Sequence, residues 1–438
     1  DFDLALADLR KVSTSSTGSQ KPGTLQAMEK VALSAGTAAL TTGNGDPIRA
    51  LGYFQSAVDA NPDSASGHAG LCDAHSRLGA AETYTLPQRA QEYEKAEPAC
   101  VRATALTTGA ARATALFALG DMRNALADLL EQSANPTPTT LSRIQTLRLG
   151  ATSAYESADT SLSAAGRGRD AAAAYLEQAD LRAAMPDQFP QSALLASLSA
   201  AESADRGSAE PVMRRGELLL ASGNDSLARN AFMTVLGGGP ASDRRDFRDI
   251  AEHRAAANYY LSGLTLQAAT SDTARRQAIE YADQAVLFGA GNKAYRELAC
   301  LARIQRGGTS VLDDESTPLC MLGAGPSDHL LRGMLFMRRA QYTNGDSAKR
   351  RVRGDARQAL NDGLDVVRDT DITQFSWPDP ARLAPARTRI LLSYLKELSR
   401  TCNDATDPFE LPGVSEAERA SAKAYLQFYK VRECRRHH

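Results

Sequence analysis

A chain of 438 residues is long enough to bury one large core or several smaller ones. It is rich in alanine and only 6% aromatic, which suits close helix–helix packing and argues against an all-β fold. Its 50 basic and 52 acidic residues give a net charge of −2, so it lacks the basic excess of a dedicated nucleic-acid binder, and no apolar run approaches the roughly 18 residues that cross a bilayer.

Residues 1–24 form the first predicted segment. Phe2, Leu6 and Leu9 fall on one face of a short amphipathic helix over residues 1–12. Residues 13–24, STSSTGSQKPGT, are too rich in Ser, Thr, Gly and Pro to bury much surface and read as a linker. We expect the tethered helix to dock on its own chain rather than on a partner.

Residues 25–136 form the second segment, in which helical patterning is continuous. Helices are expected over residues 25–42 and 46–61, and Pro47 suits the first turn of the second of these. A further unit begins at Ser64; its second helix, delayed by an insertion, holds Tyr93 and Ala96. Residues 111–135 are expected to hold another helix pair. The packing positions of the first unit are Ala50, Phe54, Ala57 and Pro62.

Residues 137–308 form the central segment, with helices expected at 139–157, 169–185, 187–206, 246–269 and 292–305. Its clearest unit runs from Val212 to Pro240. Small residues let two helices approach closely, a Gly-Asn-Asp-Ser turn joins them, and Asp225 or Ser226 can cap the second helix. The packing and turn positions of this unit are Gly216, Gly223, Ala228, Phe232, Val235 and Pro240.

The same spacing occurs in both of these units. Counting from Ala50 or from Ala228, a Phe follows after four residues, a small or aliphatic residue after seven, and a Pro after twelve. This pattern resembles the tetratricopeptide repeat, a helix–turn–helix unit of about 34 residues. The resemblance covers roughly residues 25–370. It implies an all-α fold, a right-handed superhelix of antiparallel helix pairs, which usually serves as an interaction surface.

Residues 309–438 form the last segment. Helices are expected at 329–342 and 355–367, separated by a long loop that carries the sharpest basic cluster: Lys349, Arg350, Arg351 and Arg353. This cluster is either a solvated loop or a contact with an acidic partner, an anionic polysaccharide or lipid headgroups. Arg353-Gly354-Asp355 reads as a turn with Asp355 as the next N-cap.

The remainder of this segment closes the array. Residues 371–385, with Trp377 among three prolines, read as an irregular strap. Helices follow at 386–401 and 415–432, and Ser415 with Glu418 makes a capping box for the second of them. The last helix presents an apolar face that could cover the end of the superhelix, formed by Tyr425, Leu426, Phe428 and Tyr429.

Six cysteines fall into three local pairs: Cys72 with Cys100, Cys300 with Cys320, and Cys402 with Cys434. Each pair spans about one helical hairpin, so each could staple one unit. An even number of cysteines in local pairs favours disulfides and an oxidising compartment over six unrelated buried thiols. The chain begins at Asp1 without a signal-like segment, so either a signal peptide has been removed or the numbering is arbitrary.

No motif for catalysis is present: the sequence has no GxxxxGK[ST] phosphate loop, no HExxH and no GxSxG. His68 and His75 lie two turns apart on one helical face, where a packed or surface pair is the simpler interpretation than a metal site. Asp313, Asp314 and Glu315 read as a solvated turn rather than a cation site. We therefore expect no catalytic residue, no metal ligand and no cofactor.

The leading hypothesis is a non-enzymatic, exported scaffold or accessory subunit of a bacterial cell-envelope assembly, such as a secretion, pilus or surface structure. A protein or peptide partner would lie in a concave groove. The setting would be the periplasm, the outer membrane or the cell exterior, with peripheral or lipid-anchored membrane association left open. The alternatives are a groove-type receptor for a small molecule or glycan and a cytosolic adaptor or regulator.

Overall fold

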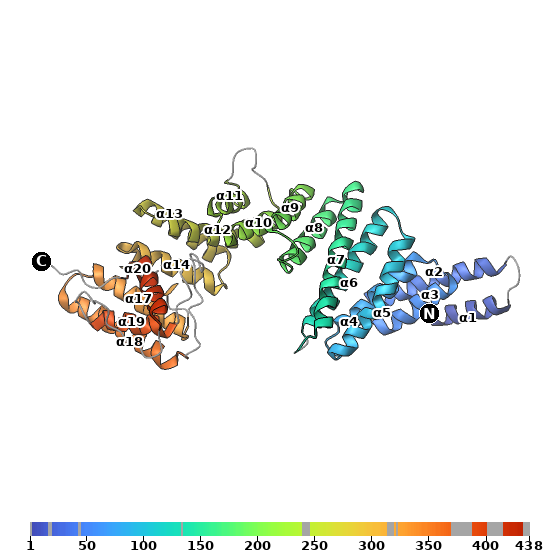
Figure 1. The fold of residues 1–438 in the computed structure, drawn as a ribbon, viewed down its shortest axis with the longest axis horizontal. Coiled ribbons are helices and arrows are strands. Elements are labelled where there is room, and N and C mark those ends of the chain that lie inside the picture. The colour runs from blue at the N-terminus through green and yellow to red at the C-terminus, as the bar shows by residue number, and fades with distance from the viewer. Residues whose placement is uncertain are drawn as a thin grey trace. The chain divides into compact units, whose positions relative to one another are not determined.

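The computed structural model describes residues 2–15, 20–42, 45–132, 135–238, 246–312, 319–320, 323–368, 388–400 and 415–431. Within these ranges all regular structure is helical and no strand occurs, so the predicted all-α fold is confirmed (Figure 1). Contacts between helices divide the chain into two compact units, residues 1–206 and residues 207–438. The division falls inside the central segment expected at residues 137–308.

The first unit is built from consecutive helices joined by short connections, which makes neighbours antiparallel. The closest packing is within the pairs α2–α3, α4–α5, α6–α7 and α8–α9. The helices are α1 (Phe2–Ser15), α2 (Gln20–Thr41), α3 (Pro47–Ala60), α4 (Ala65–Ala80), α5 (Leu86–Leu106), α6 (Gly109–Glu131), α7 (Pro138–Ala164), α8 (Gly168–Ala183) and α9 (Gln191–Ala204).

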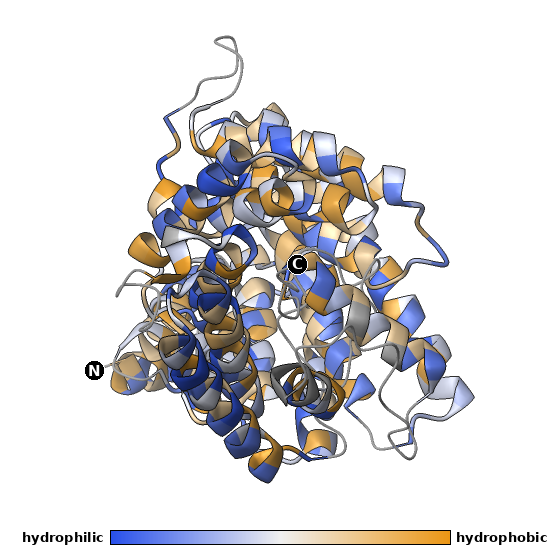
Figure 2. Cartoon of the chain, turned by 90° about the vertical axis from the view of Figure 1, so that its left-hand side faces the viewer, coloured by the Kyte–Doolittle hydropathy of each residue, from blue (hydrophilic) through white to orange (hydrophobic). Residues whose placement is uncertain are grey.

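The second unit continues with the pairs α10–α11, α12–α13 and α17–α18, while α14 packs on both α13 and α17. Most helices carry hydrophobic and hydrophilic bands side by side, as amphipathic helices do (Figure 2). The helices are α10 (Glu210–Ala221), α11 (Asp225–Val235), α12 (Ile250–Ala268), α13 (Asp272–Phe288), α14 (Lys293–Arg306), α15 (Thr309–Leu312), α17 (Pro326–Tyr342), α18 (Asp346–Val366), α19 (Thr388–Arg400) and α20 (Glu416–Phe428).

Local capping explains where several helices begin. The Asp46 carboxylate accepts a hydrogen bond from the Arg49 backbone N–H at 2.9 Å, and Pro47 occupies the first turn of α3. Ser415 and Glu418 form the predicted capping box of α20, with the Ser415 N–H donating to Glu418 at 2.9 Å. These caps satisfy N–H groups that a helix start leaves without an internal partner.

Glycines on first helices receive large side chains from second helices. A Cβ on Gly216 would lie 2.6 Å from the Phe232 ring, and a Cβ on Gly70 would lie 2.3 Å from the Phe54 ring. Of the repeat-packing positions, Pro62 is exposed, Gly223 has a φ of +76°, and Pro240 lies outside the described residues. The buried ones are Ala50, Phe54, Ala57, Gly216, Ala228, Phe232 and Val235.

The N-terminal helix docks on its own chain, as expected. Leu6 of α1 is buried in a small core with Ala32 of α2 and Tyr53 of α3. The Tyr53 hydroxyl donates to the Asp3 carboxylate at 2.6 Å, and Arg49 pairs with Asp3 at the same distance. The expected linker is shorter than the sequence indicates, because residues 13–15 extend α1 and α2 already begins at Gln20.

Two further expectations about helix boundaries are wrong. Residues 111–135 do not hold a helix pair, because α6 runs without a break from Gly109 to Glu131. Gly120 lies inside α6, and a Cβ there would lie 2.6 Å from the Tyr155 ring. The basic cluster expected in a loop lies inside α18, where Lys and Arg are good helix formers and Gly354 is tolerated. Asp355 is therefore not an N-cap.

Candidate interaction groove

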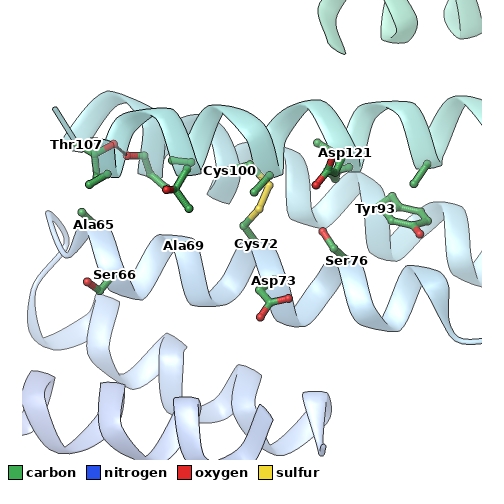
Figure 3. A pocket seen from close by; sticks show the side chains of 17 residues that line it. Ala65, Ser66, Ala69, Cys72, Asp73, Ser76, Tyr93, Cys100, Thr107 and Asp121 are labelled. Carbon is green, nitrogen blue, oxygen red and sulfur yellow. Dashed lines mark hydrogen bonds between the residues drawn. A yellow bond between two sulfur atoms is a disulfide. The ribbon is translucent and has the colours of Figure 1, made fainter. Parts of the chain in front are cut away.

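The main candidate site is a groove between α4, α5 and α6 with a volume of about 690 Å³ (Figure 3). Its walls are mostly small side chains, with one aromatic residue and two carboxylates. The residues that line it are Ala65, Ser66, Ala69, Cys72, Asp73, Ser76, Tyr93, Cys100, Ala103, Thr107, Ala111, Thr114, Ala115, Ala118, Asp121, Met122 and Ala125.

A second hollow of about 560 Å³ adjoins the first. It is lined by α2, by Phe54 of α3 and by Ser66 of α4. Because Ser66 lines both hollows, the open surface continues from α2 across α4 to α6. Helices α2, α4 and α6 are the first helices of their pairs, and α4 packs against both α2 and α6. The first unit therefore presents one extended groove along its first helices.

The two faces of α4 explain why the groove is open. Leu71, Ala74 and Leu78 are buried and hold the helix in the core. On the opposite side, Ser66, Ala69 and Asp73 are exposed and lie at helical spacing. Since none of these side chains is large, the space between α4 and α6 stays unfilled.

The groove carries negative charge, because the only charged residues that line it are two aspartates, Asp73 and Asp121. Asp73 pairs with Arg77 on the same helix at 2.9 Å. Asp121 on α6 points with Ser76 of α4 toward the space between the two helices (Figure 3). The groove therefore favours a ligand that brings positive charge.

Asp121 is the less compensated of the two carboxylates. The buried Tyr155 hydroxyl donates a hydrogen bond to it at 2.6 Å. Desolvation by the surrounding protein raises the pKa of Asp121 from its ordinary value of 3.8, and the Tyr155 hydrogen bond offsets only part of this effect. No cation pairs with Asp121 among the described residues. An incoming ammonium or guanidinium group would stabilise its charged form.

A disulfide between Cys72 and Cys100 forms part of the groove wall and joins α4 to α5, with the two Cα atoms 5.0 Å apart. The predicted pairing of these two cysteines is present. Because α5 in turn packs on α6, the covalent link helps to hold the helices around the groove at a fixed separation.

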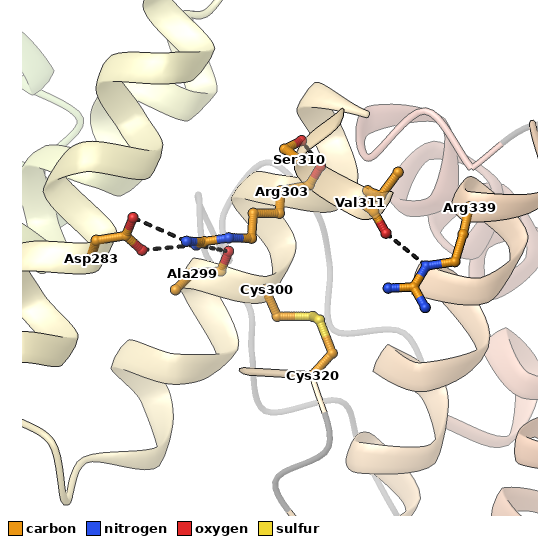
Figure 4. Close-up of a disulfide and its surroundings, with 8 residues drawn as sticks. All are labelled: Asp283, Ala299, Cys300, Arg303, Ser310, Val311, Cys320 and Arg339. Atoms are coloured by element: carbon orange, nitrogen blue, oxygen red, sulfur yellow. Dashed lines mark hydrogen bonds and ion pairs between the residues drawn. A yellow bond between two sulfur atoms is a disulfide. The ribbon is translucent and has the colours of Figure 1, made fainter. Parts of the chain in front are cut away.

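The second unit holds a disulfide between Cys300 of α14 and Cys320, with the two Cα atoms 5.2 Å apart (Figure 4). Beside it, Arg303 of α14 makes two bonds to the Asp283 carboxylate of α13, at 2.8 and 3.0 Å. Arg339 of α17 donates to the Val311 carbonyl at 2.7 Å. The disulfide and the Arg303 bonds therefore tie α14 to its neighbours, and the Arg339 bond ties α17 to α15.

Helix α14, which carries the disulfide of the second unit, has no exposed face comparable to that of α4. Whereas α4 leaves a stripe exposed, α14 is buried at every residue from Glu297 to Gln305. Tyr425 and Leu426 of α20, with Tyr429 directly after it, belong to the same core as α14. The Gln305 side-chain amide donates to the Phe428 carbonyl at 3.3 Å, 123 residues away in sequence. The expected apolar face of α20 thus covers α14.

Other residues singled out in the sequence do not form a site. His75 Nδ1 lies 2.7 Å from Glu92 and His68 Nε2 lies 3.0 Å from the Pro62 carbonyl, so the two histidines have separate partners. Across the described part of the chain, no three metal-binding side chains cluster together. Cys402, Cys434, Trp377 and residues 313–315 lie outside the described residues.

The sequence predicts a concave groove but does not identify the residues that line this one. A signal was present in α4, where small and polar residues at Ser66, Ala69, Asp73 and Ser76 repeat at helical spacing opposite the apolar face. Nothing in the sequence showed that α6 would bring Asp121 to face this stripe. Separately, none of the helices that the structure describes combines the length and hydrophobicity needed to cross a membrane.

The consecutive antiparallel helix pairs give the described part of each unit an all-α fold of helical hairpins, which is similar to the arrangement of tetratricopeptide repeats. The sequence matches no family model and no curated protein.

Solved structures with a similar fold include the following three. PilF of Pseudomonas aeruginosa is 15% identical over 62% of this chain and 97% of that chain, with a TM-score of 0.37. The P58(IPK) repeat domain is 13% identical over 85% and 97% of the two chains, with a TM-score of 0.22. Yeast Tom70 is 10% identical over 92% and 98%, with a TM-score of 0.26.

Proposed function

We propose that this chain is a non-catalytic interaction scaffold whose first unit binds a segment of a protein partner in the groove between α4, α5 and α6. The observation that carries the proposal is the groove itself, with its walls of small residues and its two carboxylates. Grooves along helical repeats commonly receive helices or extended peptides. Small walls leave room for the partner's larger apolar side chains.

The charge of the groove specifies the partner further. Asp121 is partly desolvated, and Tyr155 is the only residue that donates a side-chain hydrogen bond to it in the described structure. A Lys or Arg side chain would form a charge-assisted hydrogen bond there. The partner segment is therefore apolar and carries one basic residue that lies beside Asp121.

A peptide library displayed on phage and selected on the full-length protein tests this proposal. Selected peptides should combine apolar residues with a Lys or Arg. Ala69→Trp, which fills the groove from an exposed position, should abolish their binding, and Asp121→Asn should weaken it about tenfold. Ala173→Trp is the matched control, because Ala173 is exposed on α8 of the same unit and does not line the groove. Peptides that bind the Ala69→Trp protein as tightly as the wild type would contradict the proposal.

We further propose that the scaffold is exported and serves a bacterial cell-envelope assembly as an accessory subunit. Two disulfides support an oxidising compartment, since such bonds are rare in reducing cytosol. Each links segments that are close in sequence, 28 and 20 residues apart, as expected for covalent staples of single repeat units. The oxidation state of the cysteines in the native protein tests this setting.

A further inference from the structure

The groove between α4 and α6 has a direction. Because α4, α5 and α6 alternate in direction, α4 and α6 run parallel to each other. Figure 3 shows Ala65 and Thr107 at the end of the groove where these two helices begin. Ser76 and Asp121 lie at its opposite end, and Asp73 lies about one helical turn before Ser76. The negative charge of the groove is therefore displaced away from the two helix N-termini, where the lining residues are uncharged.

The walls of the groove repeat with the period of a helix. Large side chains on one face of a partner helix recur about every 5.4 Å, whereas those on one face of an extended strand recur about every 6.7 Å. Wall residues without large side chains, spaced by three, four or seven positions, leave hollows at the first of these intervals. These residues are Ser66, Ala69, Asp73 and Ser76 on α4, and Ala111, Ala115, Ala118 and Ala125 on α6. The groove therefore matches the side chains of a helix better than those of a strand.

The groove offers little hydrogen bonding to the backbone of an extended peptide. The hydroxyls of Thr107 and Thr114 donate to carbonyls of their own chain four residues earlier, at 2.8 and 3.2 Å. The carboxylates of Asp73 and Asp121 already accept hydrogen bonds from neighbouring side chains. An extended segment would leave the N–H and C=O groups that face these walls without partners, which is unfavourable. A helix avoids this penalty, because its backbone groups bond to one another.

Charge determines the direction in which such a helix runs. The N-terminus of a helix carries a partial positive charge and its C-terminus a partial negative charge. A partner helix antiparallel to α4 and α6 would bring its positive end to the two carboxylates and its negative end to the N-termini of α4 and α6. A parallel partner would bring like charges together at both ends. The antiparallel direction is therefore favoured, and it places a basic residue that pairs with Asp121 in the N-terminal half of the partner helix.

We infer that the groove binds an α-helix of the partner protein, antiparallel to α4 and α6, with a Lys or Arg in its N-terminal half beside Asp121. The bound helix presupposes the proposed function of the groove and specifies its ligand. From Ala65 to Ser76 the α4 wall is about 17 Å long at 1.5 Å per residue, so the bound segment has about three turns. Its apolar side chains face the walls, and its outer face remains in solvent.

Fluorescence anisotropy with two short peptides tests the direction on the full-length protein. Both peptides are about twelve residues long, blocked at both ends and locked as helices by a hydrocarbon bridge on the outer face, and they share the same apolar face. One carries its lysine in the N-terminal turn, and the other carries it in the C-terminal turn. The first should bind at least about fivefold more tightly.

Two results would overturn the inference. Equal binding of the two helical peptides, or tighter binding of the second, would contradict the antiparallel direction. Tighter binding of an otherwise equivalent peptide that prolines keep extended would contradict the helical conformation.

A substitution in the groove provides the second arm. Asp121→Asn should remove most of the difference between the two helical peptides, because the lysine then has no carboxylate at that end. Asp187→Asn is the matched control, since Asp187 is exposed in the same unit and does not line the groove. An equal effect in the control would reduce the preference to net charge and overturn the inference. A benzophenone at the N-terminal end of the first peptide should cross-link close to Ser76 and Asp121, whereas cross-links close to Ala65 would contradict the direction.

Failure of the proposed function of the groove gives a different result. Neither helical peptide would then bind, or both would bind the Ala69→Trp protein as tightly as the wild type, and the antiparallel helix would be rejected as well. Binding that Ala69→Trp abolishes, but that does not depend on the position of the lysine, would keep the groove as the binding site and overturn the direction alone.

Discussion

The charge of Asp121 would favour the proposed partner, whereas the desolvation of this carboxylate by the surrounding protein opposes folding. Desolvation raises its pKa above the ordinary value of 3.8. At a pH between the pKa of Asp121 in the unfolded chain and its raised pKa in the folded chain, the folded chain binds more protons. The Asp121 carboxyl group therefore lowers the stability of the fold as the pH rises through this range. We expect Asp121→Asn to raise the melting temperature at pH 7, with the gain vanishing below about pH 3.8. Thermal unfolding followed by circular dichroism across pH measures this.

Asp73 is the matched control for this prediction. It lies in the same groove but pairs with Arg77, so Asp73→Asn removes a favourable contact and should give no gain in melting temperature at pH 7. The prediction is wrong if both variants shift the melting temperature in the same direction. A stabilised Asp121→Asn protein that has also lost peptide binding would show that Asp121 serves the partner rather than the fold.

At the scale of helices, the close packing of neighbouring helices depends on glycines that leave room for large side chains. A Cβ on Gly70 would lie 2.3 Å from the Phe54 ring, which is itself only 4% exposed and would lie 2.6 Å from a Cβ on Gly36. Phe54 has no room to move away, so Gly70→Ala should destabilise the protein by about 1–3 kcal/mol. Denaturant unfolding followed by far-ultraviolet circular dichroism measures this change.

Gly52 provides the opposite case on α3, the helix that carries Phe54. Nothing lies within 4 Å of a Cβ at this exposed position, so Gly52→Ala adds helix propensity without a clash. It should stabilise the protein by about 0.5–1 kcal/mol. If the Gly70→Ala protein proves as stable as the Gly52→Ala protein, Gly70 is not required to make room for the Phe54 ring.

The same helices show what the sequence could predict. The sequence predicts α3 nearly at its observed ends and the turn between α10 and α11 at its observed place, because Pro47, Asp46 and the turn at Gly223 are local signals. Gly120 and Gly354 do not indicate where a helix ends. A glycine that makes room for a neighbouring side chain and a glycine that ends a helix look alike in sequence. The residues that line the groove could not be predicted either, because Asp73 of α4 and Asp121 of α6 come to one groove only through the packing of these two helices.

The whole molecule consists of two compact units, and each contains one described disulfide. Loop-closure entropy for separations of 28 and 20 residues amounts to about 3 kcal/mol of stabilisation per bond. In the first unit the Cys72–Cys100 disulfide lies beside the open groove. In the second unit the Cys300–Cys320 disulfide lies in the core that α20 covers. Reduction should therefore destabilise both units, but only in the first should it disturb partner binding directly.

The mass of the native protein after alkylation in denaturant tests both the bonds and the proposed exported setting. Without reductant, Cys72, Cys100, Cys300 and Cys320 should remain unalkylated because they are paired. With reductant all six cysteines should react. If the reduced sample carries six more alkyl groups than the unreduced sample, rather than four more, Cys402 and Cys434 are paired as well. Protein isolated from its natural source with six reactive thiols before reduction would contradict an oxidising compartment, and the scaffold would then belong among reduced cytosolic adaptors.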